Sequence, residues 1–139
     1  MIKLINIYQD PIADHTVSIL WEHLAQRTPE QSISHKEMPT KIQHYQFVMS
    51  RPYEVWYLIE DGIGGPPHVV GNIYITKHRE VGIHIAPDFR GRGIGGHALM
   101  MLRAEHPGRL LANINPLNRK SISFFKQHGA RLLQHTFEL

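Results

Sequence analysis

The feature that most restricts the fold of this chain is a group of four glycines within six positions, placed directly before good helix formers. The segment reads GRGIGG at positions 91–96 and continues as HALMM at 97–101. Glycine inside a helix costs about 1 kcal/mol relative to alanine, so the cluster indicates a close approach to the backbone. The N–H groups at a helix start bind anions, and Arg90 and Arg92 add positive charge. The segment therefore predicts a turn that holds phosphate.

Two other phosphate-binding patterns do not match this segment. The letters fit the G-x-G-x-x-G of dinucleotide-binding folds, but that fold needs a carboxylate about 20 positions later. The sequence at that distance is LANIN, at positions 111–115. A nucleoside-triphosphate loop needs Gly-Lys-Ser/Thr after the glycines, and none follows. A glycine-rich turn that only changes the chain direction remains as the alternative.

Composition excludes several classes of protein. A chain of 139 residues is expected to form one domain, residues 1–139. The absence of cysteine removes disulfides, thiolate metal sites and a cysteine nucleophile. A net charge of +3 without a dense Lys/Arg run argues against nucleic-acid partners. The 11 histidines form no His-Glu-x-x-His pattern, so no metal is expected. No apolar run approaches the roughly 18 residues of a membrane span, and the start does not resemble a signal peptide. We expect no membrane partner and a cytoplasmic location.

Hydrophobic periodicity and turn residues predict a single α/β (α+β) domain with the order β-α-α-β-β-β-α-β-α-β. Its sheet is mixed, mostly antiparallel, and flanked by helices. The expected strands are residues 1–8, 54–60, 69–76, 80–86, 110–114 and 131–139. The expected helices begin at Asp10-Pro11 and Pro39-Thr40 and cover residues 94–105 and 118–128.

Two motifs together resemble the GNAT family of N-acetyltransferases. The first is the Arg/Gln-x-x-Gly-x-Gly/Ala signature, here RGRGIG at 90–95, after a strand that ends in Ile85-Ala86-Pro87. The second is an asparagine, a small residue three positions later, an aromatic pair and a glycine, here NRKSISFFKQHG at 118–129. The resemblance covers residues 54–139 well, and the first half agrees only in element order. It implies an acyltransferase, of the EC 2.3.1 class, that uses acetyl-CoA.

The resemblance also implies where the coenzyme binds. In the family, the pyrophosphate of acetyl-CoA lies on the amides of the glycine turn, and the pantetheine arm pairs with the fourth strand. The helix after the asparagine flanks the other side. Gly93 and Gly95 are the positions where a side chain is expected to collide with the ligand. The expected coenzyme-binding residues are Ile83, Ile85, Ala86, Arg90, Gly91, Arg92, Gly93, Ile94, Gly95, Gly96, Asn118, Ser121 and Phe125.

The catalytic residues are less clear, because the chain departs from the family at two positions. Many relatives use a strand glutamate as base and a tyrosine on the last helix as acid, where this chain has Asn113 and Phe125. The predicted catalytic residues are His84, whose imidazole titrates in a useful range, and Glu80. The alternative for His84 is a hydrogen-bonded histidine at a strand edge, and for Glu80 a solvated residue at a strand start. Predicted acceptor-side residues are His35, Glu37 and Asn113.

The expected reaction is direct transfer of acetyl in a ternary complex, because a thiol acyl-enzyme is impossible without cysteine. A primary amine on a small molecule, such as an amino sugar or a polyamine, is the expected acceptor. A protein N-terminus or lysine is the alternative within enzymes. A non-catalytic acyl-CoA-binding module is the alternative outside them, and the expected assembly is a monomer or homodimer.

Overall fold

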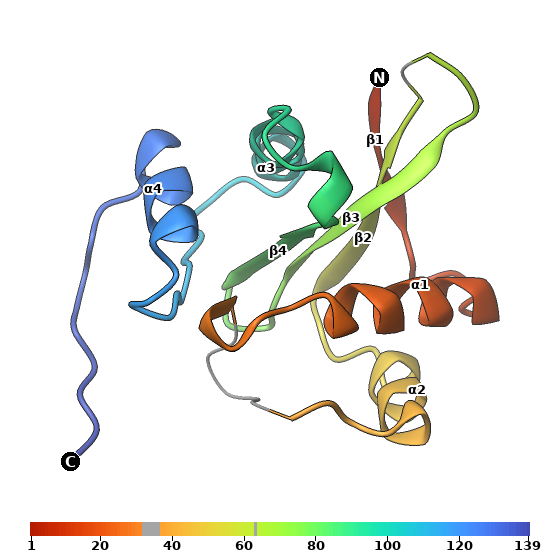
Figure 1. The fold of residues 1–139 in the computed structure, drawn as a ribbon, viewed down its shortest axis with the longest axis horizontal. Coiled ribbons are helices and arrows are strands. Elements are labelled where there is room, and N and C mark those ends of the chain that lie inside the picture. Colours follow the sequence, from red (N-terminus) through yellow and green to blue (C-terminus); the bar gives the residue numbers. More distant parts are fainter. Residues whose placement is uncertain (32–36, 63) are drawn as a thin grey trace.

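The computed structural model describes residues 1–31, 37–62 and 64–139. Strands, helices and two short 3-10 helices follow one another in a mixed order, which confirms the predicted fold class (Figure 1). In chain order the elements are β1 (Ile2–Asn6), α1 (Asp14–Ala25), η1 (Pro29–Gln31), α2 (Lys41–Met49), β2 (Val55–Asp61), β3 (His68–Ile75), β4 (Val81–Ile85), η2 (Pro87–Phe89), α3 (Ile94–Glu105) and α4 (Arg119–Gln127).

The four strands form one antiparallel sheet in the order β1-β2-β3-β4, so neighbours in sequence are neighbours in space. The register places Leu4 opposite Ile59 and Ile73 opposite Ile83. A shift of register between Ile59 and Glu60 bends β2 near its end. Short connections join β2 to β3 and β3 to β4, whereas the chain between β1 and β2 runs through α1 and α2.

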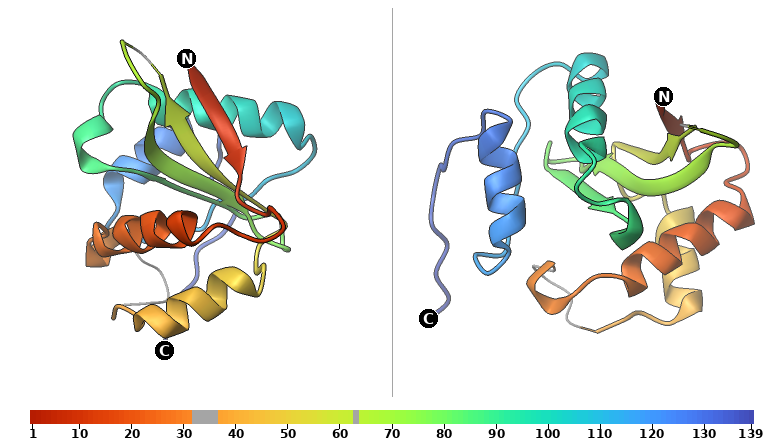
Figure 2. Two further views of the ribbon diagram at one scale, coloured as in Figure 1. Left: turned by 90° about the vertical axis from the view of Figure 1, so that its right-hand side faces the viewer. Right: turned by 45° about the horizontal axis from the view of Figure 1, so that its top comes forward.

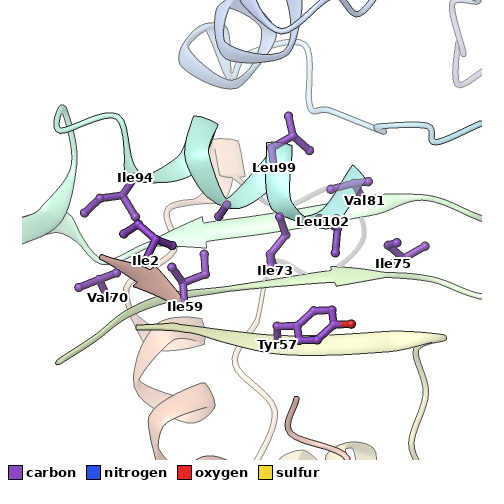
Figure 3. Packing of buried hydrophobic residues seen from close by; sticks show 11 residues of the cluster. Ile2, Tyr57, Ile59, Val70, Ile73, Ile75, Val81, Ile94, Leu99 and Leu102 are labelled. Carbon is purple, nitrogen blue, oxygen red and sulfur yellow. The ribbon is translucent and has the colours of Figure 1, made fainter. Parts of the chain in front are cut away.

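One face of the sheet is covered by α3. Alternate residues of a strand point to the same face, and Ile59, Ile73 and Val81 meet Leu99 and Leu102 of the helix (Figure 3). Ile59, Ile73 and Leu102 have no exposed surface. This cluster fixes α3, and with it the glycine turn at the start of α3, against the end of β4.

The opposite face is covered by α1, with α2 packed beside it (Figure 2). Val17 and Leu20 lie three residues apart on one side of α1, and they pack with Trp56, Leu58 and Val48. The sheet therefore lies between two helical layers. Residues of β4 that point away from α3 must point toward α1.

Local sequence explains where two of the helices begin. Thr40 caps α2: its hydroxyl accepts from the Gln43 N–H, and the Gln43 side chain accepts from the Thr40 N–H. The Asn118 side chain caps α4 by accepting from the Ser121 N–H at 3.2 Å. Among the helices of the described residues, none has the length and apolarity needed to span a bilayer.

Two of the predicted strands do not form. Residues 110–114 are reduced to a single parallel bridge between Leu111 and Glu80. Residues 131–139 form no strand and are exposed throughout. Their alternating pattern is strand-like, but a strand needs a neighbour for its backbone groups. No strand of the described residues lies beside this segment, which runs along the side of α4 that faces away from the sheet (Figures 1 and 2).

Candidate functional site

The turn between β4 and α3 is built on two glycines in left-handed conformations. Gly91 has φ of 77° and Gly93 has φ of 76°, values that other L-residues adopt only at a cost of roughly 1–2 kcal/mol. A Cβ built on either glycine would meet nothing within 4 Å. The backbone conformation therefore favours glycine at both positions, and the space beside the turn is open.

The amides at the start of α3 face this open space. Gly93 is the N-cap and has no side chain to accept from the first turn, and His97 is the first residue to bond back, to the Gly93 carbonyl at 3.1 Å. The N–H groups of the first turn have no partner inside the helix. Such unpaired N–H groups at a helix start, with open space beside the turn, suit an anion such as a phosphate.

The two arginines of the turn differ in their contacts. Arg90 Nε donates to the Ile85 carbonyl at 2.8 Å, which ties the turn to the end of β4. The Arg92 guanidinium lies over the Phe89 ring, 5.6 Å from its centre. Arg92 and Gly93 also border a cavity of about 390 Å³ that includes His97. Asp61 borders the same cavity, and its carboxylate lies 3.4 Å from the amino terminus of Met1.

Gly95 and Gly96 bring α3 close to β4 and α4. A Cβ on Gly95 would lie 3.5–3.7 Å from Phe124 and Ile83, an ordinary contact distance. A Cβ on Gly96 would lie 2.6 Å from Nε2 of His128, whose Nδ1 donates to the Phe124 carbonyl at 2.7 Å. The missing side chain of Gly96 therefore leaves room for the His128 ring, which lets α4 pack against α3. Phe125 is half-buried beside Phe124 and packs at the edge of the main core.

The outer edge of β4 carries backbone groups without a neighbouring strand in the described residues. The Val81 N–H bonds to the Leu111 carbonyl at 2.7 Å on that side. Because alternate residues of a strand direct their backbone groups to opposite edges, those of Ile83 and Ile85 face the same way. An extended ligand could pair there as an added strand, next to Ala86 where β4 ends.

On the α1 side, His84 lies in a chain of polar side chains in which His84, His23 and Asn72 are buried and Gln26 is exposed. Its Nε2 is 2.9 Å from Oε1 of Gln26, and its ring centre is 5.2 Å from that of His23. His23 Nδ1 is 2.9 Å from Nδ2 of Asn72, whose Oδ1 accepts from the Trp56 indole at 3.0 Å. An indole can only donate. Asn72 must therefore donate to His23, and the proton of the neutral His23 ring sits on Nε2.

Burial keeps both histidines neutral. It lowers the pKa of His84 to about 3, and the charges of Arg27, His23 and Arg90 act in the same direction. It lowers the pKa of His23 to about 4, with Arg27 again contributing. A group of such low basicity takes up little proton at neutral pH. A rate that rises through the ordinary imidazole range would not come from His84.

Glu80 lies at the other end of β4. Its carboxylate accepts from the Asn113 side chain, at the point where Leu111 bridges to the strand. Four residues of strand put about 13 Å between Glu80 and His84. The structure thus brings together Glu80 and Asn113, and it separates His84 from both. Glu37 is exposed, and His35 lies outside the described residues.

Sequence reasoning missed the partners of His84. His23 follows Leu20 by three residues, so it continues the apolar side of α1 into the interior. Asn72 is the one strongly polar residue within VVGNIYI, at 69–75, and it is 5% exposed. In both α1 and β3, a polar residue at a position where the pattern is otherwise apolar could have indicated these partners.

A cavity of about 590 Å³ lies between α1, the start of β3 and η2. It reaches Ala86 at the end of β4. Among the described residues, its lining includes Glu22, Glu60 and Asp88 together with His15, His23 and His68, and no lysine or arginine. Such a lining favours a cationic group. No set of three His, Cys, Asp or Glu side chains suited to a metal ion occurs in the described ranges.

Comparison with known proteins identifies the family. A sequence model of the acetyltransferase (GNAT) family matches residues 18–130, and no curated protein matches. A domain from Methanocaldococcus jannaschii has a TM-score of 0.80 at 23% identity, covering 99% of this chain and 93% of that one. The yncA protein of Salmonella typhimurium, solved with its cofactor acetyl-CoA, has a TM-score of 0.65 at 18% identity, over 93% and 78%. The ribosomal-protein-alanine N-acetyltransferase of Brucella melitensis has a TM-score of 0.65 at 19% identity, over 93% of this chain and 83% of that one.

The match to the family model spans most of the chain. The chain therefore belongs to the GNAT family of acetyltransferases, which are enzymes of the EC 2.3.1 class that use acetyl-CoA.

Proposed function

We propose that this chain is a single acetyltransferase domain that moves an acetyl group from acetyl-CoA to a primary amine of a small molecule. The observation that carries the proposal is the turn with Gly91 and Gly93, whose left-handed backbone leaves the α3 amides open. When bound, acetyl-CoA supplies a thioester carbonyl that an uncharged amine can attack, with a thiolate as leaving group.

The chain's own residues bind and orient this coenzyme. The amides of Ile94, Gly95 and Gly96 hold the pyrophosphate. The outward backbone groups of Ile83 hold the pantetheine arm, and Phe125 forms an apolar wall on the α4 side, with the capped start of α4, Asn118 and Ser121, at its end. Phenylalanine has no proton to give. A thiol with a pKa of about 8.5 leaves without help, so this chemistry needs no acid on α4.

Of the two predicted proton acceptors, we assign the step to Glu80. Its carboxylate lies where residues 110–114 leave β4, at the beginning of the strand's open edge, next to Asn113. Glu80→Gln is expected to lower turnover by about 10²–10⁴-fold, the usual effect of losing a positioned acid–base group. His84→Gln is expected to leave the pH dependence of the rate unchanged, because His84 is neutral across the working range. The opposite pattern would return the catalytic role to His84.

The cavity beside α1 lies at the end of β4 opposite to Glu80, so it supports a polyamine whose second cationic group lies away from the reacting amine. Glu22, Glu60 and Asp88 supply negative charge within a volume of about 590 Å³. Glu22→Gln is expected to raise the KM for a cationic amine several-fold and to leave the KM for acetyl-CoA unchanged. Glu138→Gln, at an exposed position outside the cavity, is the matched control.

Calorimetry with coenzyme A tests the binding site. Gly93→Glu introduces side-chain bulk and a negative charge beside the phosphates, and the loss of charge-assisted bonds should weaken binding about 100-fold or more. Gly64→Glu is a matched control, because Gly64 also has φ of 77° and no atom within 4 Å of a built Cβ but lies in the β2–β3 connection. Equal affinities for the parent and Gly93→Glu would contradict the proposal.

Release of free thiol from acetyl-CoA then identifies the acceptor, and a chain without cysteine gives no background. The panel contains polyamines, amino sugars, a lysine peptide and a peptide that begins with alanine, since a ribosomal-protein-alanine acetyltransferase shares the fold. We expect the small amines to react. If only a peptide reacts, the acceptor is an amine of a protein and not of a small molecule. Tight coenzyme binding without release by any amine would make the chain an acyl-CoA-binding module.

A further inference from the structure

One hydrogen-bond donor on α1 has no acceptor in the described part of the protein. The Trp56 indole donates to Oδ1 of Asn72 at 3.0 Å, so the amide nitrogen of Asn72 faces Nδ1 of His23 at 2.9 Å and donates to it. The proton of the neutral His23 ring is therefore on Nε2. Among the described residues, Nε2 makes no hydrogen bond, and the His84 ring lies beside it, 5.2 Å away between centres, without one. The Nε2–H group of His23 is available to a ligand.

This donor lies at the inner end of the cavity beside α1. In the described ranges no buried side-chain nitrogen or oxygen lacks a hydrogen-bond partner, so an unbonded Nε2 must reach open space although His23 is only 5% exposed. The cavity of about 590 Å³ is the open space that His23 borders. His23 and Ala86 are buried members of its lining, whereas Glu22 and Asp88 are exposed. A ligand that enters the cavity therefore meets the carboxylates first and the imidazole N–H last.

The imidazole of His23 donates a hydrogen bond without carrying a charge. Burial lowers its pKa to about 4, and the charge of Arg27 acts in the same direction, so the ring is neutral at neutral pH. A neutral donor does not repel a cationic acceptor, as a lysine or arginine would. An ammonium group has no lone pair and cannot accept from Nε2–H, whereas a hydroxyl or carbonyl oxygen can. The carboxylates therefore suit a cation, and the inner end of the cavity suits an uncharged oxygen.

We propose that His23 determines acceptor specificity by donating from Nε2 to an uncharged oxygen of the amine substrate. The acceptor is then a polyamine that also carries a hydroxyl or carbonyl oxygen. Glu22 and Asp88 hold its cationic groups, and the oxygen lies beyond them at His23. His23 takes no part in the proton transfer assigned to Glu80. Because this cavity is taken as the acceptor site, the role of His23 rests on the proposed function.

Nuclear magnetic resonance of the full chain, labelled with ¹⁵N, tests the donor without any reaction. Comparison of the parent with His23→Gln identifies the ring signals of His23. At neutral pH we expect a neutral ring with its proton on Nε2, and this signal should move when 1,3-diamino-2-propanol is added. The matched amine without the oxygen, 1,3-diaminopropane, should move it less. A proton on Nδ1, or equal shifts with the two amines, would overturn the proposal.

Kinetics tests whether the oxygen is recognised during turnover. The two substrates are spermine and its analogue in which a hydroxyl group replaces one terminal amine. In the parent we expect the hydroxyl to lower KM about tenfold, the usual effect of pairing one donor that is otherwise left unpaired. The value of kcat should stay unchanged, because a bond remote from the reacting amine is made equally in the ground and transition states.

Three variants show whether His23 causes this preference. His23→Phe removes both ring nitrogens and should abolish the difference in KM between the two substrates. His23→Gln keeps a neutral N–H donor and should retain part of it. His135→Phe, at an exposed position outside the cavity, is the control and should keep all of it. Each variant is compared on the same two substrates, so their different numbers of reactive amines cancel.

The possible outcomes separate the role of His23 from the proposed reaction. If both substrates react and the KM difference is the same in the parent and in His23→Phe, the reaction stands and the role of His23 is wrong. If neither substrate reacts but the Nε2–H signal moves more with the hydroxylated amine, the donor stands and the assigned reaction is wrong. Circular dichroism checks the fold of His23→Phe. If that variant does not fold, the position of the proton and the signal shifts in the parent decide the proposal.

Discussion

The chain up to Leu102 and the chain from Arg103 onward are stabilised in different ways. Every residue that is buried in the described ranges lies between Ile2 and Leu102, where the sheet is packed between α3 and the α1–α2 layer. From Arg103 to Leu139, all of which is described, no residue is buried. The first part contains the buried core. The second part is held by a few contacts and gains the most from whatever binds to it.

The second part is tied to the first by polar bonds and by side chains that are only partly buried. The Tyr57 hydroxyl lies 2.7 Å from Nε2 of His106, and the Arg79 guanidinium donates to the His106 carbonyl at 3.3 Å. Leu111 bridges to β4, and Phe124 packs at the edge of the main core. Regions with few fully buried contacts open locally at low free energy. The coenzyme would add contacts in this region. Binding and order are therefore expected to be coupled in residues 103–139.

The largest expected effect is on the core of the first part. Ile59 has no exposed surface, and Ile59→Ala should lower the free energy of unfolding by about 2–5 kcal/mol through lost burial and a cavity. Phe125→Ala, in the second part, should cost less than about 1.5 kcal/mol, since the ring is only half-buried. Chemical denaturation at one protein concentration measures both. Equal losses of unfolding free energy in the two variants would show that residues 103–139 share the main core, and would contradict the difference between the two parts.

The next effect is the pH dependence of stability in the first part. The pKa values of His23 and His84 are about 4 and 3 in the folded chain, below their ordinary value near 6.5. Between those values the unfolded chain binds more protons, so stability is full above about pH 6.5 and falls as pH drops toward 4. The slope is at most about 1.4 kcal/mol per pH unit for each histidine.

Denaturation midpoints between pH 4.5 and 7.5 measure this slope. His84→Gln should flatten it, because glutamine takes up no proton. His135→Gln, at an exposed position of the second part, should leave it unchanged. An identical slope in the parent and in His84→Gln would mean that His84 is protonated in the folded chain.

The smallest effect is local to the second part. In Gly96→Ala the new Cβ would lie 2.6 Å from Nε2 of His128, so α4 must move. The substitution also gains about 1 kcal/mol of helix propensity in α3, which leaves overall stability nearly unchanged. Hydrogen exchange should rise in residues 119–128 and stay constant in β2 and β3. Gly65→Ala, with no atom near its Cβ, is the control, and unchanged exchange in α4 would show that His128 simply turns aside.

Local sequence was enough to predict most elements of the first part and the turn. The glycine turn is set by residues next to one another, since Gly91 and Gly93 are required by their own φ values. The strand predicted at 80–86 is observed as Val81–Ile85, because alternation is a property of the strand itself. At the turn and in this strand, the local structure is determined by residues that are close together in the sequence.

The remainder depends on contacts between distant residues. The position of His84 on its strand can be predicted from alternation, but its low pKa is caused by burial and by the charges of Arg27 and His23, which are far away in sequence. Residues 131–139 have the alternation of a strand, yet a strand forms only where a partner edge is in reach. A single sequence does not specify which edge that is.

The open edge of β4 has a consequence for handling the protein. Outward-facing backbone groups such as those of Ile83 offer a template to any extended chain, including unfolded copies of the same protein. A ligand that pairs with this edge occupies the template. We therefore expect coenzyme A to act as a protective additive, so that samples saturated with it stay clear of aggregates during concentration and storage for longer than samples without it.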